Sequence, residues 1–304
     1  MAAFTPGLVH TPVTPFSRDR SIDFALYGKL TDFHLGHGAQ SLALPMHAGE
    51  SVSLAASERR HLVEFAIAHV QGRAPVVVHV SEAGTGLAVA LARHAQQAGA
   101  AAIVATTPYY WTPPAAMLVE HFCEIGAAVE IPLFVHNAPE EMQGTRVTAE
   151  LCRTLIAKLT NLAGVVDSSL DWQFMIELKT DAPRLRPSFQ LVSGTELMVS
   201  PAAIGAAGMF APLAAIAPRL VHELYELCRT QKLFEARNAQ EQLAALRQAV
   251  KRGGVASIKA AMRALGRDCG APRSPVLPLD PASCQRLVSE MDAIPSLRGE
   301  PRGW

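Results

Sequence analysis

The sequence predicts an α/β protein, a (β/α)8 TIM barrel followed by a C-terminal helical appendage. Short apolar runs alternate with longer segments of helical periodicity, and this strand–helix unit recurs over roughly 215 residues with the size and rhythm of such a barrel. A doubly wound open sheet is the competing arrangement for alternating strands and helices. The even spacing of the units favours closure into a barrel.

The expected strands are apolar over most of their length, which is typical of strands buried on both faces of a parallel sheet. They cover residues 7–13, 41–45, 75–80, 101–105, 132–136, 163–166, 190–193 and 208–211. The segments between them are amphipathic and predict helices on the outer face of the barrel. Such segments include residues 21–37, 57–71, 86–98, 115–128 and 147–159.

Further helices are predicted after the last strand, at residues 217–229, 234–250, 255–265 and 281–291. The first of these completes the outer ring of helices, so residues 1–230 are expected to form the barrel. Residues 231–304 are expected to form a helical extension packed on the barrel, because no segment between the two has the composition of a flexible linker.

Composition and charge exclude several classes of partner. The 304 residues include 27 basic and 27 acidic side chains, without any basic cluster, so nucleic acid and anionic membrane surfaces are not expected partners. No apolar run is long enough to span a membrane, and the N-terminus lacks the pattern of a secretory signal. Five widely spaced cysteines without a CxxC pair predict reduced thiols. The protein is therefore expected to be cytoplasmic.

Several different short motifs follow one another along nearly the whole chain. They lie at residues 7–16 (GLVHTPVTPF), 49–51 (GES), 107–110 (TPYY), 137–139 (NAP), 193–194 (SG), 258–261 (IKAA) and 271–279 (APRSPVLPL). Together they resemble the dihydrodipicolinate synthase / N-acetylneuraminate lyase family of pyruvate-handling aldolases. The resemblance implies the barrel fold, a lyase or aldolase scaffold, and a homodimer or homotetramer.

The resemblance implies that Val166 occupies the position of the lysine that forms a Schiff base with the keto acid. Valine has no amine and cannot form an imine. The chain's six lysines lie in helical segments or the tail, and none ends a predicted strand, where (β/α)8 barrels carry their active sites. Exposed helix lysines also lack the desolvation that a Schiff-base amine needs. Schiff-base chemistry is therefore predicted to be absent.

Other positions that match the family's active site have changed as well. His136 replaces the tyrosine that relays protons, and His47-Ala48 replace the threonine pair that hydrogen-bonds pyruvate. Glu141 lies near the position of the arginine that holds a substrate carboxylate. Tyr110 keeps its type, and in the family this tyrosine reaches into a neighbouring subunit's site. These coordinated changes indicate a re-purposed barrel rather than a damaged aldolase.

If the protein is catalytic, the expected chemistry is acid–base catalysis on a small keto, hydroxy or sugar acid, without a cofactor. His136 and Tyr110 are the candidate proton carriers, since imidazole titrates near neutral pH and a phenol can donate to an enolate or carboxylate. The candidate substrate-binding residues lie at or near the strand ends and are His47, Ala48, Glu141, Val166, Asp167 and Glu196.

Two alternatives stay open from the sequence alone. The same side chains could line an inherited cavity without catalysis, which would make the protein a small-molecule sensor or binding protein. His47, His136 and Asp167 could instead form a 2-His-1-carboxylate site for a divalent ion, as in a metal-assisted aldolase or hydratase. These three residues come from separate strands, and no short-spacing ligand motif supports the metal site.

Overall fold

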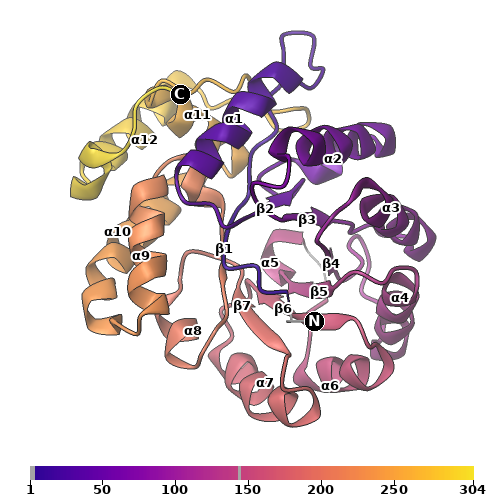
Figure 1. Ribbon diagram of the computed structural model, residues 1–304. Coiled ribbons are helices and arrows are strands. Elements are labelled where there is room, and N and C mark those ends of the chain that lie inside the picture. The colour runs from indigo at the N-terminus through magenta and orange to yellow at the C-terminus, as the bar shows by residue number, and fades with distance from the viewer. Residues whose placement is uncertain (1–3, 143–144) are drawn as a thin grey trace.

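A computed structural model describes residues 4–142 and 145–304, and it confirms the predicted barrel. Parallel strands β1 to β8 pair in chain order and close on themselves, because β1 pairs with both β2 and β8. The helices surround this barrel (Figure 1).

The strands are short and almost entirely buried. They are β1 Leu8–His10, β2 Ser41–Leu44, β3 Val76–His79, β4 Ala102–Thr106, β5 Leu133–Asn137, β6 Leu162–Asp167, β7 Gln190–Ser193 and β8 Met209–Ala211. β1 ends earlier than predicted, since Pro12 has no backbone N–H to donate to a neighbouring strand.

The outer layer contains one main helix after each strand. These helices are α1 Phe24–Gly36, α2 Ala56–Val70, α3 Thr85–Ala98, α4 Ala115–Ala127, α6 Ala149–Lys158, α7 Trp172–Leu185, α8 Val199–Ala203 and α9 Pro218–Arg229. Short helical turns precede α2, α6 and α9, and a fourth lies near the C-terminus. They are η1 Ser51–Ser53, α5 Pro139–Met142, η2 Pro212–Ala215 and η3 Pro295–Gly299.

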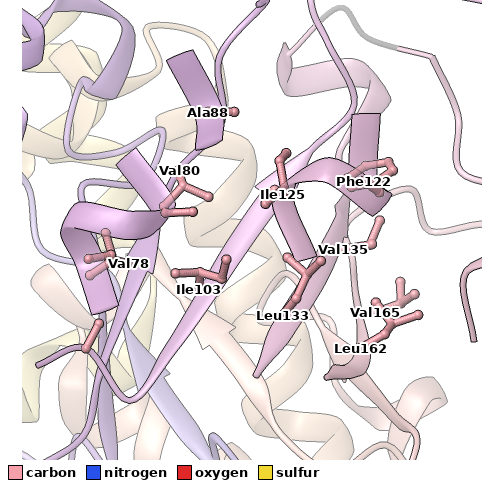
Figure 2. Packing of buried hydrophobic residues seen from close by; sticks show 14 of the residues in the cluster. Val78, Val80, Ala88, Ile103, Phe122, Ile125, Leu133, Val135, Leu162 and Val165 are labelled. Atoms are coloured by element: carbon pink, nitrogen blue, oxygen red, sulfur yellow. The ribbon is translucent and has the colours of Figure 1, made fainter. Parts of the chain in front are cut away.

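Alternating strand residues build two separate apolar layers, because successive side chains of a strand point to opposite faces. One layer lies between strands and helices, where Ile103, Leu133 and Val135 pack near Phe122 and Ile125 of α4 (Figure 2). The other fills the barrel interior and contains Val9, Ala43, Met46, Val77, Ala102, Val104, Phe134, Val166, Val192 and Phe210. This alternation decides which side chains can face a site at the barrel mouth.

The tail forms the predicted helical extension, with α10 Leu233–Lys251, α11 Val255–Ala264 and α12 Pro281–Asp292. It shares an apolar cluster with α9 and η2. A buried ion pair between Lys259 of α11 and Glu50, with Nζ 2.7 Å from Oε1, fixes the tail to the loop after β2. Within the described ranges, no helix is both long and apolar enough to cross a membrane.

Candidate functional site

A cavity of about 400 Å³ opens at the C-terminal ends of the barrel strands. Its lining comes from residues at or just after the ends of β1, β2, β5, β6, β7 and β8, and from the junction of α10 and α11. The volume lies within the range of small-molecule sites, and the position is that of the active sites of (β/α)8 barrels.

His136 forms part of the cavity floor. It alternates with Phe134, which belongs to the barrel interior, so its imidazole also points inward, and it is 4% exposed. Its Nε2 lies 3.0 Å from Ser168 Oγ, which is also 3.2 Å from the carbonyl oxygen of Gly194. Gly194 permits this arrangement, because a Cβ there would lie 2.1 Å from the Ser168 hydroxyl. An imidazole and a hydroxyl therefore meet at the floor.

Val166 is the neighbour of His136 across the β5–β6 pair, in direct register with it. Its side chain is fully buried in the barrel interior, and it is not among the described residues that line the cavity. Direct contact between Val166 and a ligand therefore stays a prediction, and the described lining of this cavity does not support it. The apolar side chain instead supports the floor beside His136.

A second inward-facing imidazole, His79 of β3, lies deeper in the barrel and is 3% exposed. Its Nε2 is 2.7 Å from Ser81 Oγ. Burial, together with the nearby positive charge of Arg59, lowers the pKa of His79 well below its usual value. The interior beneath the cavity therefore contains a neutral imidazole.

Asp167 is not part of the described lining of the cavity. Because Val166 points inward, Asp167 points toward the helix layer, where its Oδ1 accepts hydrogen bonds from Asn137 Nδ2 at 2.7 Å and Ser169 Oγ at 2.8 Å. Burial raises the pKa of this carboxyl group.

The proposed metal ligands are consequently not brought together. His47 lies exposed at the cavity rim and His136 at its floor, while Asp167 is directed away from both. In the part of the chain that the structure describes, no group of three or more His, Cys, Asp or Glu side chains is arranged to hold a metal ion. The described part of the structure therefore gives no support to the alternative of a 2-His-1-carboxylate site.

The remaining predicted residues divide between the cavity and its surroundings. His47 and Ala48 line the cavity. Tyr110 is 96% exposed with φ of 83° and lies outside the described lining. The side chain of Glu141 lies outside what the structure describes, although the preceding Glu140 lines the cavity.

Glu196 supports the cavity from behind and does not belong to its described lining. It is fully buried, and its Oε1 accepts the Leu213 backbone N–H at 2.6 Å. Its Oε2 lies 3.5 Å from Arg247 Nη1. The carboxylate therefore fixes an arginine on the wall and is not a direct ligand contact.

Two cationic residues of α10, Arg247 and Lys251, line the cavity and were missed by the sequence analysis. The assumption that all lysines lie away from the site is thus wrong for Lys251, whose Nζ is 3.7 Å from Glu140 Oε2. Their spacing of four residues places both on one face of a helix. Nothing in the sequence indicates that this face meets the barrel mouth.

The closed parallel barrel with a cavity at the C-terminal ends of its strands places the protein in the class of TIM-barrel proteins. Within this class, the family described as the dihydrodipicolinate synthetase family matches residues 5–294. The chain belongs to this family.

Individual relatives extend over almost the same length. The chain is 30% identical over 290 residues to the 4-hydroxy-tetrahydrodipicolinate synthase of Azoarcus sp. strain BH72, covering 94% of this chain and 97% of that one. It is 32% identical over 266 residues to the enzyme of the same name from Caldicellulosiruptor bescii, covering 87% and 88%. The structure also superimposes, with a TM-score of 0.90 and 26% identity, on YagE, a prophage protein of this family from E. coli K12 in complex with pyruvate, covering 97% and 99%.

Proposed function

We propose that this protein binds a small carboxylic acid in the cavity at the barrel mouth and that His136 transfers a proton on it, without a Schiff base. The observation that carries this proposal is the position of His136 at the cavity floor, with Nε2 3.0 Å from Ser168 Oγ, directly beside the buried Val166. Imidazole is the side chain whose ordinary pKa lies nearest neutral pH, which suits it to both giving and accepting a proton.

The placement of the lysines near the site supports a mechanism without an imine. A Schiff-base amine must be desolvated or lie near another cation to be reactive. Lys251 lines the cavity, but its side chain is 74% exposed and lies beside a carboxylate. Lys259 is 2% exposed, but it is held by Glu50 and lies outside the described lining of the cavity.

The acid class follows from the relatives and from the cavity walls. YagE was solved with pyruvate, a 2-oxo acid. In this chain, a carboxylate would find Arg247 and Lys251 on the α10 side of the cavity, and a carbonyl or hydroxyl group would find His136 and Ser168 on the floor. Base-assisted removal of a proton next to the carbonyl would give an enolate that these floor groups can hydrogen-bond.

A second copy of the chain is part of the proposal, because Tyr110 can act on a ligand only from outside its own cavity. It is 96% exposed, and the neighbouring Trp111 is 47% exposed. A homodimer or homotetramer would cover these aromatic side chains and bring Tyr110 to a neighbouring site.

A binding protein without catalysis is the second candidate. The observation that favours it is that His136 is the single expected proton carrier in the described lining, since Tyr110 lies outside it. One general acid or base by itself contributes less to a reaction that needs proton transfer at two positions.

Proton exchange separates these candidates. Wild-type protein is incubated in deuterium oxide with pyruvate or 2-oxobutanoate, and deuterium at the carbon next to the carbonyl is followed by NMR. We expect exchange in the wild type and a loss of about 100-fold or more in His136→Phe, the size of a general-base contribution. Binding of the acid without exchange in the wild type would reject catalysis and leave the sensor. Equal exchange in both proteins would reject the role of His136.

A further inference from the structure

Much of the cavity wall is apolar, and both the barrel and the tail contribute to this part of it. From the barrel come Met46 after β2, Phe210 of β8 and Leu213 of η2, and from the tail come Val250, Val255 and Ile258. All six side chains are less than one-tenth exposed. These side chains give a ligand in the cavity an apolar surface to pack against, beside the polar groups of the lining.

Such walls discriminate between the acids that the proposed function leaves open. Each methylene group removed from water strengthens binding by about fourfold. A hydroxyl group placed against the same walls loses its hydrogen bonds to water without replacement, which weakens binding by on the order of tenfold. A polyhydroxylated sugar acid would carry several such groups, so it fits these walls poorly.

Charge is confined to one side of the cavity. Arg247 is 24% exposed, and its Nη1 lies 3.5 Å from the buried Glu196, which is held in turn by the Leu213 backbone N–H. Lys251 and Glu140 are paired at 3.7 Å with both side chains more than two-thirds exposed. Exposed ion pairs of this kind contribute little stability, so a ligand carboxylate can replace Glu140 beside Lys251 at little cost.

We propose that the ligand is a carboxylic acid with an aliphatic or aromatic body, such as a long-chain or arylalkyl 2-oxo acid, and not a sugar acid. Its carboxylate lies against Arg247 and Lys251, its body against the apolar walls, and its carbonyl or hydroxyl group over His136 and Ser168. This inference rests on the proposed function only in taking the barrel-mouth cavity as the ligand site.

Binding measured by calorimetry tests the ligand class without requiring turnover. The probes are 2-oxohexanoate, 2-oxo-4-phenylbutanoate, pyruvate, D-gluconate and the uncharged 4-phenylbutan-2-one. We expect the two apolar acids to bind at least tenfold more tightly than pyruvate. We also expect gluconate and the ketone to bind more weakly than the apolar acids. Gluconate binding as tightly as the apolar acids, or no binding of any apolar acid, overturns the inference.

Matched variants locate the contacts. Arg247→Gln and Lys251→Gln should each weaken the binding of the apolar acids by about tenfold. Arg237→Gln is the control on the same helix and should leave the binding unchanged, because its guanidinium lies over the Phe234 ring. Val250→Thr introduces a hydroxyl group into the cavity wall and should weaken the binding of the apolar acids several-fold. The control Val288→Thr, at a partly exposed position of α12, should leave the binding unchanged. Thermal melts confirm that each variant is folded. Unchanged affinity in all three cavity variants overturns the site.

Failure of this inference and failure of the proposed function give different results. Tight binding of apolar acids that exchange no proton in deuterium oxide rejects the catalytic proposal and leaves the ligand class intact. Exchange on a sugar acid, lost in His136→Phe, while apolar acids do not bind, supports the catalytic proposal and rejects the ligand class.

Discussion

We propose that position 166 is where this chain departs most sharply from a Schiff-base aldolase. The valine is fully buried, in register with the inward-facing His136, and packed with apolar side chains of the barrel interior. A lysine at this position would extend from the same Cβ toward the cavity that His136 reaches. Its stem would replace the valine packing, and its amine would lie near the floor in a poorly hydrated environment.

We therefore expect Val166→Lys to gain an amine that pyruvate can modify. Treatment with pyruvate and borohydride should give a stable adduct on the introduced lysine, detected by intact mass and peptide mapping, because desolvation keeps an amine reactive. The substitution should also destabilise the protein, and Val166→Met provides the control, with an overpacking cost of about 1–3 kcal/mol. A folded Val166→Lys variant without an adduct would show that a side chain at position 166 does not reach the cavity.

At the scale of elements, a buried ion pair contributes to the attachment of α11 to the barrel, beside the apolar cluster that the tail shares with η2. Glu50 and Lys259 are 4% and 2% exposed, their charged atoms are 2.7 Å apart, and the Lys259 ammonium lies 4.4 Å from the centre of the Phe16 ring. Glu50 also accepts the Arg273 backbone N–H at 2.7 Å. Burial lowers the pKa of Lys259, and the carboxylate of Glu50 opposes this shift.

Breaking this pair from one side should cost about 3–5 kcal/mol of unfolding free energy, because it leaves a buried charge without its partner. Glu50→Gln and Lys259→Met, measured by urea unfolding, should each show this loss. The double variant should lose less than the sum, since neither charge then remains. Because the start of α11 lines the cavity, the single variants should also bind the acid ligand more weakly. Additive single losses would mean that the two charges are not coupled.

At the scale of the whole molecule, buried histidines make the fold sensitive to acid. His10, His34, His79 and His121 are at most 3% exposed, and burial is the largest cause that lowers the pKa of each, to about 3 for His34 and about 4 for His121. In the unfolded chain these imidazoles titrate near 6.5. Below that pH the unfolded state therefore binds more protons than the folded state, and stability falls as the pH falls.

We expect full stability from this source above about pH 6.5 and a progressive loss between about pH 6.5 and pH 4. The four imidazoles give a slope of at most about 5 kcal/mol per pH unit, which the raised pKa values of Asp167 and Glu300 partly offset. Urea unfolding across this pH range measures the slope. His121→Asn should reduce the slope of the unfolding free energy against pH by the contribution of about one proton. His61→Gln, at an exposed position, should leave this slope unchanged. A flat profile would mean that these imidazoles are protonated in the folded protein.

The barrel could be predicted from the sequence because apolar strands and amphipathic helices repeat with their own periods. The site was harder to predict, since a shift of one residue reverses the face of a strand. His136 points inward and Asp167 outward, although both lie near the carboxyl ends of neighbouring strands. Arg247 and Lys251 enter the cavity only because the tail docks there, and a local sequence pattern carries no information on that docking.

The central claim is that this family member works without an imine, and mass spectrometry of the wild-type protein tests it most directly. The protein is incubated with pyruvate, reduced with borohydride and measured intact, with Val166→Lys as the positive control. We predict no adduct on the wild type under conditions that label the control. A stable adduct on the wild type, mapped to Lys251 or any other lysine, would contradict the claim.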